Sequence, residues 1–385
     1  MGPVIFIVAG EASGDVLGAR LMQALAALRP GLEFRGIGGA RMSEQGLVSL
    51  FPMRELAVMG LVEILPRVRA LARRLDETVA EITRTRPALV VTIDSPGFTL
   101  RLLRRIAPLG IPRLHYVAPQ VWAWREHRVR EFPGLWERLL CLLPFEPEFF
   151  ARHGIEARFT GHPVLQSGAD TGDATRFRTR HGIAAGAHVV MLMPGSRRSE
   201  APRLLPVFGR TLALLSGSVS GIVPVVAAST VVAETVQRAT RKWPIPPIIV
   251  TETADKHDAF AASGAALTKS GTSTLELALA GVPMAVTYRV NPVTAAIARR
   301  LIRVPYVAMV NLLAKQALVP ELLQQDCRPE KLAAVLRELL TDQAMATRQK
   351  EGFVAVLDRL RTPLGTPSEA AAREILELLD NVSDT

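Results

Sequence analysis

The chain has 385 residues, 49% of them hydrophobic, and carries a formal net charge of +10. This length exceeds what one core usually covers and the apolar content excludes disorder, so we expect two folded domains. Its two cysteines, Cys141 and Cys327, exclude a disulfide framework and a cysteine-rich metal site, which indicates a reducing cytoplasm. The positive charge comes almost wholly from arginine. Either genomic base composition or attraction to anionic partners explains it.

The chain opens with an apolar strand over 4–8, a glycine-rich turn over 9–15 and a helix to about Leu28. Strand, loop and helix are typical of a Rossmann-like unit. The loop lacks G-x-G-x-x-G and no acidic residue follows at dinucleotide spacing, so we predict no NAD site. The first residues do not resemble a signal peptide, and no run of 18 uncharged apolar residues predicts a transmembrane helix.

A strongly amphipathic helix is predicted over 56–75, where an apolar stripe has arginines at its sides. A helix packed on the core with a solvated basic face would have this pattern. So would a helix lying in a membrane interface with its arginines on anionic headgroups. In the second interpretation the membrane contacts are Leu61, Ile64, Leu65, Arg67 and Arg69.

Polar side chains follow two further predicted strands. The apolar run over 87–93 is typical of a buried parallel strand, and Asp94 comes directly after it. Doubly wound sheets place their chemistry at this strand end, although Asp94 could also cap the next helix. The strand over 114–117 is followed by Gln120 and two tryptophans, an amphipathic wall. His127 has no second ligand at metal spacing, and we predict no metal site.

Two glycine- and serine-containing loops follow strands in the second half. The strand over 189–193 leads to Ser196 and Arg197, and the strand over 265–268 leads to Gly271 and a helix. Backbone N–H groups at such turns, together with a guanidinium, suit a diphosphate, whereas ordinary β–α turns are the alternative. Glu276 lies one turn into the second helix, at the reach of ribose hydroxyls. We expect Ser270, Thr272 or Ser273 to cap that helix.

Strands alternate with helices in both halves, which predicts an α/β protein of two Rossmann-like, doubly wound domains facing a cleft. The polar stretch from Leu165 to about Ala185 is interpreted as the connection between them. A capping box with proline at the first helical position, over 366–369, starts a final helix. The expected domains are 1–166, joined by C-terminal helices over 350–385, and 167–349.

Ten distinctive motifs are spread in order over nearly the full length of the chain. They are AGEASGD at 9–15, GIGG at 36–39, MG at 59–60, DSPGF at 94–98, HYVAPQVWAWRE at 115–126, LPFEPEFF at 143–150, GHP at 161–163, PGSRRSE at 194–200, KSGTSTLE at 269–276 and VNLLA at 310–314. Together they resemble lipid-A-disaccharide synthase, a family of inverting glycosyltransferases with the GT-B fold. One departure is visible, because Lys315-Gln316-Ala317 stands where the family resembles Gly-Arg-Glu, which puts a donor contact there in doubt.

The resemblance implies transfer of 2,3-diacylglucosamine from UDP to the 6-hydroxyl of 2,3-diacylglucosamine 1-phosphate, with inversion, in lipid A biosynthesis. Asp94 matches the family's proposed base. The implied roles of the other residues fall into two groups. The donor side comprises Ser196, Arg197, Gly271, Thr272, Ser273, Glu276, Asn311 and Gln325, and the acceptor side comprises Ser13, Gly14, Asp15 and Gln120.

The resemblance further implies an acceptor- and membrane-facing N-terminal domain and a C-terminal domain that binds the UDP-sugar, with no cofactor and no metal. It also implies a peripheral protein on the cytoplasmic face of the anionic inner membrane, and a homodimer with exchanged C-terminal helices. A UDP-sugar epimerase or the transferase of peptidoglycan assembly would share the nucleotide loops. A nucleic-acid-binding module would explain the charge, but aromatics are only 5% of the chain, and we expect no nucleic-acid partner.

Overall fold

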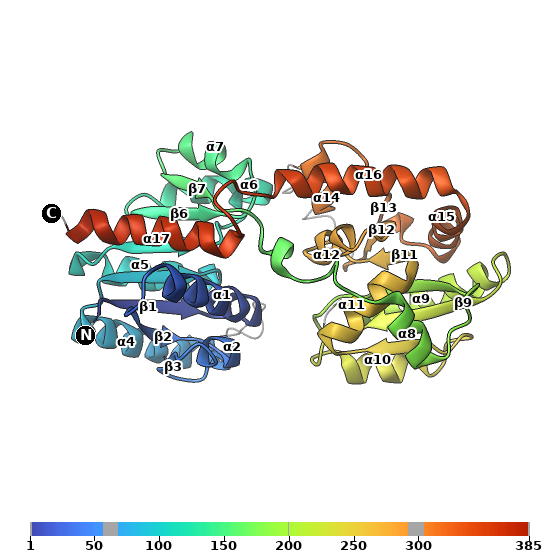
Figure 1. The fold of residues 1–385 in the computed structure, drawn as a ribbon, viewed down its shortest axis with the longest axis horizontal. Helices are drawn as coiled ribbons and strands as arrows, with labels where there is room; N and C mark the ends of the chain where they lie inside the picture. Colours follow the sequence, from blue (N-terminus) through green and yellow to red (C-terminus); the bar gives the residue numbers. More distant parts are fainter. Residues whose placement is uncertain (1, 57–67, 199, 292–303, 384–385) are drawn as a thin grey trace. The chain divides into compact units, whose positions relative to one another are not determined.

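The computed structural model describes residues 2–56, 68–198, 200–291 and 304–383 (Figure 1). The chain divides into two compact units: Met1–Pro163 with Leu360–Thr385, and Val164–Arg359. The break after Pro163 falls three residues before the expected one at 166. The return falls ten residues after the expected one at 349, because the helix that ends at Arg359 belongs wholly to the second unit.

The first unit is built on a parallel sheet with the strand order β3-β2-β1-β4-β5-β6-β7 over the described residues. The order reverses between β1 and β4, which makes the carboxyl ends of these two neighbours the topological switch point. In chain order the strands are β1 (Val4–Ala9), β2 (Glu33–Ile37), β3 (Val48–Ser49), β4 (Leu89–Ile93), β5 (Arg113–Tyr116), β6 (Arg138–Cys141) and β7 (Ala157–Phe159).

Helices cover both faces of this sheet because alternate residues of each buried strand point to opposite faces. Ile5 and Ile7 pack in the cluster that contains α1, whereas Phe6 and Val8 pack in the cluster that contains α5. The described helices of the unit are α1 (Ala12–Leu28), α2 (Ala40–Ser43), α4 (Val68–Thr85), α5 (Pro96–Ile106), α6 (Val121–Trp124), α7 (Glu146–Ala151) and α17 (Pro367–Ser383). Residues 57–67 of the predicted amphipathic helix lie outside the described residues.

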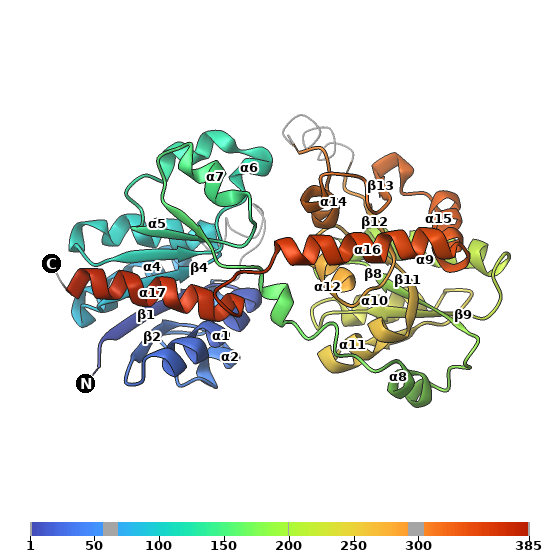
Figure 2. The ribbon, with the colours of Figure 1, turned by 45° about the horizontal axis from the view of Figure 1, so that its top comes forward.

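The last helix, α17, belongs to the first unit although it is the last element in sequence; it runs beside α1 (Figure 2). Its buried alanines and Ile375 join the core cluster of α1 and the sheet. The predicted capping box is present, since Thr366 N donates to Glu369 Oε2 at 2.8 Å and Glu369 N donates to Thr366 Oγ1 at 3.3 Å. Arg138 on β6 adds an ion pair with Glu374 at 2.9 Å.

The second unit repeats the design with the strand order β10-β9-β8-β11-β12-β13, again parallel throughout the described pairings. Its switch point lies between β8 and β11. In chain order the strands are β8 (His188–Met193), β9 (Ile222–Ala227), β10 (Ile248–Val250), β11 (Ser263–Thr268), β12 (Met284–Tyr288) and β13 (Glu321–Leu323).

The helices of the second unit include several that the sequence did not predict, among them α8 inside the expected connection. The sequence His257-Asp258-Ala259-Phe260 predicts a helix that opens at His257, but the helix begins four residues earlier, at Thr253. A second helix, predicted from the sequence over 291–301, falls almost wholly outside the described residues. The described helices are α8 (Ala174–His181), α9 (Ala201–Ser216), α10 (Ala233–Thr240), α11 (Thr253–Ala262), α12 (Ser273–Leu279), α14 (Met309–Ala314), α15 (Pro329–Thr341) and α16 (Gln343–Arg359).

Candidate active site

Asp94 follows β4 at the switch point of the first sheet, in a backbone conformation that few side chains adopt. Asp94 and Ser95 have φ of +51° and +47°, both left-handed. Asp94 N donates to Tyr116 O at 2.9 Å, and Thr99 Oγ1 donates to Asp94 O at 2.8 Å, so neighbouring elements hold the bend. Burial raises the pKa of the Asp94 carboxyl, against a smaller lowering by the Ser95 N–H. This carboxyl is therefore a better proton acceptor than an exposed aspartate.

The loop after β1 lies against the Asp94 turn because glycine leaves room for it. A Cβ built at Gly10 would lie 2.5 Å from Ser95 Oγ, and one built at Gly14 would lie 3.6 Å from Ile93 O. Ser13 is exposed at the start of α1, whereas Gly14 is buried. The structure thus brings Ser13 and Gly14 to the strand end that carries Asp94.

Asp15, also predicted on the acceptor side, has its carboxylate occupied within the unit. It accepts hydrogen bonds from the backbone N–H groups of Gly39, Arg41 and Met42 at 2.8, 3.1 and 3.0 Å. It is 6% exposed and closes the N-terminus of α2 from a different element. These hydrogen bonds support the loop that contains the GIGG motif at 36–39.

Gln120 is exposed in the loop after β5, the strand next to β4. Two residues on, Trp122 Nε1 donates to Glu146 Oε1 at 3.0 Å. Glu146 is 2% exposed, and its other oxygen accepts from Leu142 N and Leu143 N at 3.1 and 3.0 Å. Burial raises the pKa of Glu146 to about 7, despite three donors that favour the ionised form. Sequence reasoning missed this group, although it lies in the LPFEPEFF motif.

In the second unit, the loops after β8 and β11 meet at the switch point. Ser196 and Arg197 are exposed on the first loop, and Lys269 opens the second. Glu200, 6% exposed, accepts from Lys269 Nζ at 2.9 Å and from Arg197 Nη1 at 3.4 Å. Glu200 and Lys269 were not among the predicted site residues. The only sequence signal for them was that they lie in the motifs PGSRRSE and KSGTSTLE.

The turn before α12 contains Gly271 with φ of +148°, a backbone conformation that favours glycine. The expected hydroxyl cap is absent from α12. Ser270 Oγ donates to Val307 O at 2.6 Å, and Ser273 Oγ lies 3.0 Å from Thr268 Oγ1, while Thr272 at the cap position makes no side-chain cap bond. That prediction was wrong because nearby acceptors compete for the hydroxyls.

Glu276 lies on α12 as predicted and meets a cation from α11. Lys256 Nζ donates to both of its carboxylate oxygens, at 3.0 and 3.1 Å, and both side chains are 21% exposed. Lys256 was not predicted, because nothing in the local sequence relates it to a glutamate 20 residues later. A ribose that reached Glu276 would share the carboxylate with this ammonium.

Asn311 and Gln325, the remaining predicted donor residues, have different environments. Asn311 is fully buried. Its amide donates to Val319 O and Glu321 Oε1, and its carbonyl accepts from Val319 N. Its polar atoms therefore hold the turn before β13 in place. Gln325 is exposed just after β13.

Of the predicted membrane contacts, Leu61, Ile64, Leu65 and Arg67 lie outside the described residues, and Arg69 is exposed near the start of α4. Among the described residues, none of the helices has both the length and the apolar character that a membrane span needs. Over the same ranges, histidine, cysteine, aspartate and glutamate side chains do not gather in a group that could hold a metal ion.

Solved structures with the same architecture match essentially the whole chain. The S. aureus MnaA–UDP co-structure has a TM-score of 0.68 at 13% identity and covers 100% of this chain and 97% of that one. UDP-GlcNAc 2-epimerase from Neisseria meningitidis bound to UDP-GlcNAc has a TM-score of 0.66 at 12% identity and covers 98% and 100%. The calicheamicin glycosyltransferase CalG4 has a TM-score of 0.60 at 16% identity and covers 99% of each chain. The two α/β units, each built on a parallel sheet, therefore have the GT-B fold.

The sequence comparisons identify the family. The family described as Lipid-A-disaccharide synthetase matches residues 5–375. Lipid-A-disaccharide synthase of Gluconobacter oxydans is 65% identical over 379 residues, covering 98% of this chain and 91% of the relative. That of Granulibacter bethesdensis is 62% identical over 388 residues, covering 98% and 99%. The chain belongs to the lipid-A-disaccharide synthase family, the glycosyltransferases that form the disaccharide of lipid A.

Proposed function

We propose that Asp94 is the general base of the family's transfer reaction. The acceptor's 6-hydroxyl gives its proton to the Asp94 carboxylate while its oxygen bonds to the anomeric carbon of the donor sugar. The bond from that carbon to the UDP oxygen breaks in line, which inverts the configuration. The observation that carries this assignment is a half-buried carboxylate held in a left-handed turn at the switch point, where burial raises its pKa.

The second unit binds UDP in this proposal. Arg197 and the backbone amides near Ser196, Gly271, Thr272 and Ser273 hold the diphosphate and stabilise its charge as it leaves. Glu276 accepts hydrogen bonds from the ribose hydroxyls. Gln325, exposed at the same strand ends, contacts the donor. Asn311 supports the donor site indirectly, because its amide group is hydrogen-bonded to Val319 and Glu321 within the unit.

The first unit binds the acceptor. Ser13, at the start of α1, and Gln120, in the loop after β5, are exposed at the ends of the strands on either side of β4, so their side chains are the ones that contact the acceptor sugar. Gly14 and Asp15 support this side of the unit, Gly14 by its small size and Asp15 by its hydrogen bonds to Gly39 and the first turn of α2.

The partners we propose beyond the two acylated substrates are an anionic membrane surface and a second copy of the chain. The arginines and the apolar stripe of 56–75 would contact the cytoplasmic face of the inner membrane, where acylated substrates reside. A homodimer that exchanges the C-terminal helices would keep the contacts of α17 and make them with the partner's first unit.

Substitution of the base tests the mechanism. Asp94→Asn should lower the turnover number for tetraacyl disaccharide phosphate about 10²- to 10⁴-fold, because general-base catalysis contributes about that much. The affinity for UDP, measured by calorimetry, should stay unchanged. Product is measured by mass spectrometry with both acylated substrates present. Near-normal turnover in the variant would remove Asp94 from the base role, and loss of UDP binding would instead indicate misfolding.

A further inference from the structure

The buried carboxylate of Glu200 connects the loop after β8 with the loop after β11, the two loops of the second unit that are proposed to bind UDP. It precedes α9 and lies under the first loop. A Cβ built at Gly195 would fall 2.6 Å from Glu200 Oε2, and Gly195 has φ of +102°. Oε1 accepts a hydrogen bond from Lys269 Nζ at 2.9 Å and another from Arg197 Nη1 at 3.4 Å. Oε2 is buried and has no hydrogen-bond partner among the described residues.

Lys269 reaches this carboxylate from the neighbouring strand end. Its backbone N–H donates to Met193 O at 3.1 Å, which sets the start of one loop beside the start of the other. Its side chain is 17% exposed, and its Cε lies 3.5 Å from where a Cβ at Gly271 would be. Nζ lies 5.8 Å from the Tyr288 ring centroid. The ammonium is therefore held along the turn that Gly271 opens.

The charges of this cluster do not balance. Two cations, Arg197 and Lys269, share one carboxylate oxygen, which leaves one net positive charge on the three groups. Because Lys269 and Glu200 are largely buried, solvent screens this charge less than it would at the surface. An anionic group placed above the loops would complete the charge balance, and a diphosphate has the charge to do so.

We propose that Lys269 is a further donor-binding cation, which contacts the diphosphate beside Arg197, and that Glu200 is the positioning residue for both side chains. The inference rests on the proposed binding of UDP by these loops. As the bond from the anomeric carbon to the diphosphate oxygen breaks, its electron pair stays on that oxygen. The ammonium then interacts more strongly with the leaving group than with the bound donor.

The first test compares UDP with uridine, which lacks the phosphates, as ligands of the full-length protein in calorimetry. Lys269→Met should weaken UDP binding about tenfold to hundredfold, the usual effect of losing a charge-assisted hydrogen bond, and leave uridine binding unchanged. Lys269→Arg should retain most of the UDP affinity. The matched control is Lys350→Met, an exposed lysine on α16, which should change neither affinity. Unchanged UDP affinity in Lys269→Met, or equal losses for UDP and uridine, would overturn the proposal.

The positioning role of Glu200 is tested by a double-mutant cycle. If Glu200 acts through Lys269, Glu200→Gln should weaken UDP binding in the wild-type background and have a smaller effect when Lys269 is already methionine. Fully additive effects would refute positioning. The double variant has no buried carboxylate that has lost its lysine partner. If Lys269→Met alone fails to fold, UDP binding by the double variant can therefore still be compared with that of Glu200→Gln.

The failure of this inference can be told apart from the failure of the donor site. Arg197→Met should weaken UDP binding if the loops bind the diphosphate at all. If Arg197→Met weakens UDP binding and Lys269→Met does not, the role of Lys269 alone is refuted. If neither substitution affects UDP binding, the donor site and the role of Lys269 are both refuted.

Discussion

The Asp94 turn shows how contacts from a few residues hold the backbone in a strained conformation. Each left-handed non-glycine residue costs on the order of 1–3 kcal/mol, and Asp94 and Ser95 are consecutive. Thr99 Oγ1 donates to both Asp94 O and Ser95 O, at 2.8 and 3.0 Å, and Gly10 makes room for the Ser95 side chain. Because several elements fix the turn at once, the carboxyl is oriented before any substrate arrives.

Glu146 gives the first unit a titration that stability measurements can detect. Its pKa rises from 4.5 in the unfolded chain to about 7 in the folded protein, chiefly through burial. Between these pH values the folded state binds more protons, so the contribution of Glu146 to the free energy of unfolding falls as pH rises. We expect Glu146→Gln to abolish this decline, which amounts to roughly 2–4 kcal/mol between pH 5 and pH 8.

Denaturant titrations of wild type and variant at both pH values measure this difference. Glu148→Gln is the matched control, because Glu148 is exposed on the same helix and pairs only at the surface with Arg152. A wild-type-minus-variant difference that is independent of pH would contradict the raised pKa of Glu146.

Some residues of the candidate site could be predicted from sequence and others could not, for a physical reason. Asp94 directly follows an apolar run and Arg197 lies four residues after another, so their position near a strand end is a local property. Asp15 and Glu276 were also identified, but their partners at 39–42 and at Lys256 depend on how loops and helices meet in space. A buried carboxylate such as Glu200 looks like a surface residue in sequence, because only tertiary packing covers it.

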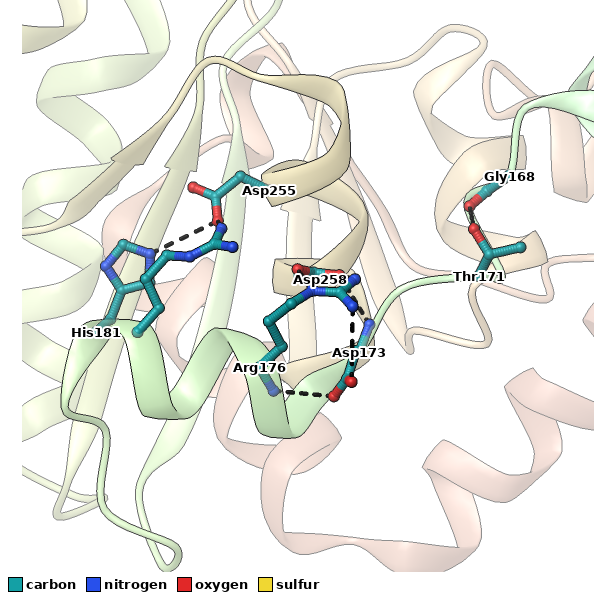
Figure 3. Close-up of polar contacts among 8 residues, drawn as sticks. Gly168, Thr171, Asp173, Arg176, His181, Asp255 and Asp258 are labelled. Carbon is teal, nitrogen blue, oxygen red and sulfur yellow. Dashed lines mark hydrogen bonds and ion pairs between the residues drawn. The ribbon is translucent and has the colours of Figure 1, made fainter.

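At the scale of elements, α8 is attached to α11 by a cluster of carboxylates and cations (Figure 3). Asp258, 1% exposed, accepts from Arg176 Nε at 2.6 Å and from Asp173 N at 2.9 Å. Arg180 pairs with Asp255 one turn away, and the neighbouring Lys256 pairs with Glu276. The same helix, α11, thus holds α8 and carries the cation that meets the proposed ribose carboxylate.

Removal of the central carboxylate should loosen α8. Asp258→Ala is expected to lower the free energy of unfolding of the second unit by about 1–3 kcal/mol, because the half-exposed Arg176 can rehydrate. In the wild type, the hydrogen bond from Arg176 holds the pKa of Asp258 below its usual value of 3.8. The stability that Asp258 contributes is therefore present above pH 3.8 and is lost as the pH falls below that value. The loss in the variant should therefore shrink in acid.

Amide exchange in α8, followed at neutral pH, measures the effect. Asp173→Ala, which removes the cap on Arg176 N at 2.9 Å and a half-exposed ion pair with Arg176 Nη1 at 3.8 Å, should cost about 1 kcal/mol and expose the first turn alone. Equal protection of α8 in wild type and Asp258→Ala would contradict the role assigned to Asp258.

The existence of α8 shows where composition misled the sequence reading. Its polar residues predicted a connection, yet Asp173 caps it, fully buried Phe177 anchors it and Gly182 ends it with φ of +62°. These cap signals were present in the sequence. In contrast, the alternation of strands and helices predicted both parallel sheets, because central strands such as β1, β4 and β8 are buried and nearly continuous apolar runs.

At the scale of the whole molecule, the first unit is discontinuous in sequence. Leu360–Thr385 returns to it after the entire second unit, and His162 N donates to Leu360 O at 3.0 Å where the two passes of the chain meet. Arg29 and Asp380 pair at 2.7 Å across the helices. The first unit can therefore be completed only after the rest of the chain has been synthesised.

This connectivity predicts where a C-terminal substitution acts. Ile375 is fully buried on α17 among the residues of α1 and the first sheet, so Ile375→Ala should remove about 2–5 kcal/mol from the unfolding free energy of the first unit. Calorimetry with and without UDP distinguishes the units, since a ligand raises the transition of the unit that binds it. The transition that UDP does not raise should shift down, and the UDP-sensitive one should stay. Val354→Ala, at a 60% exposed position on α16, should shift neither. A downward shift of the UDP-sensitive transition in Ile375→Ala would mean that α17 stabilises the unit proposed to bind UDP, which its packing on α1 argues against.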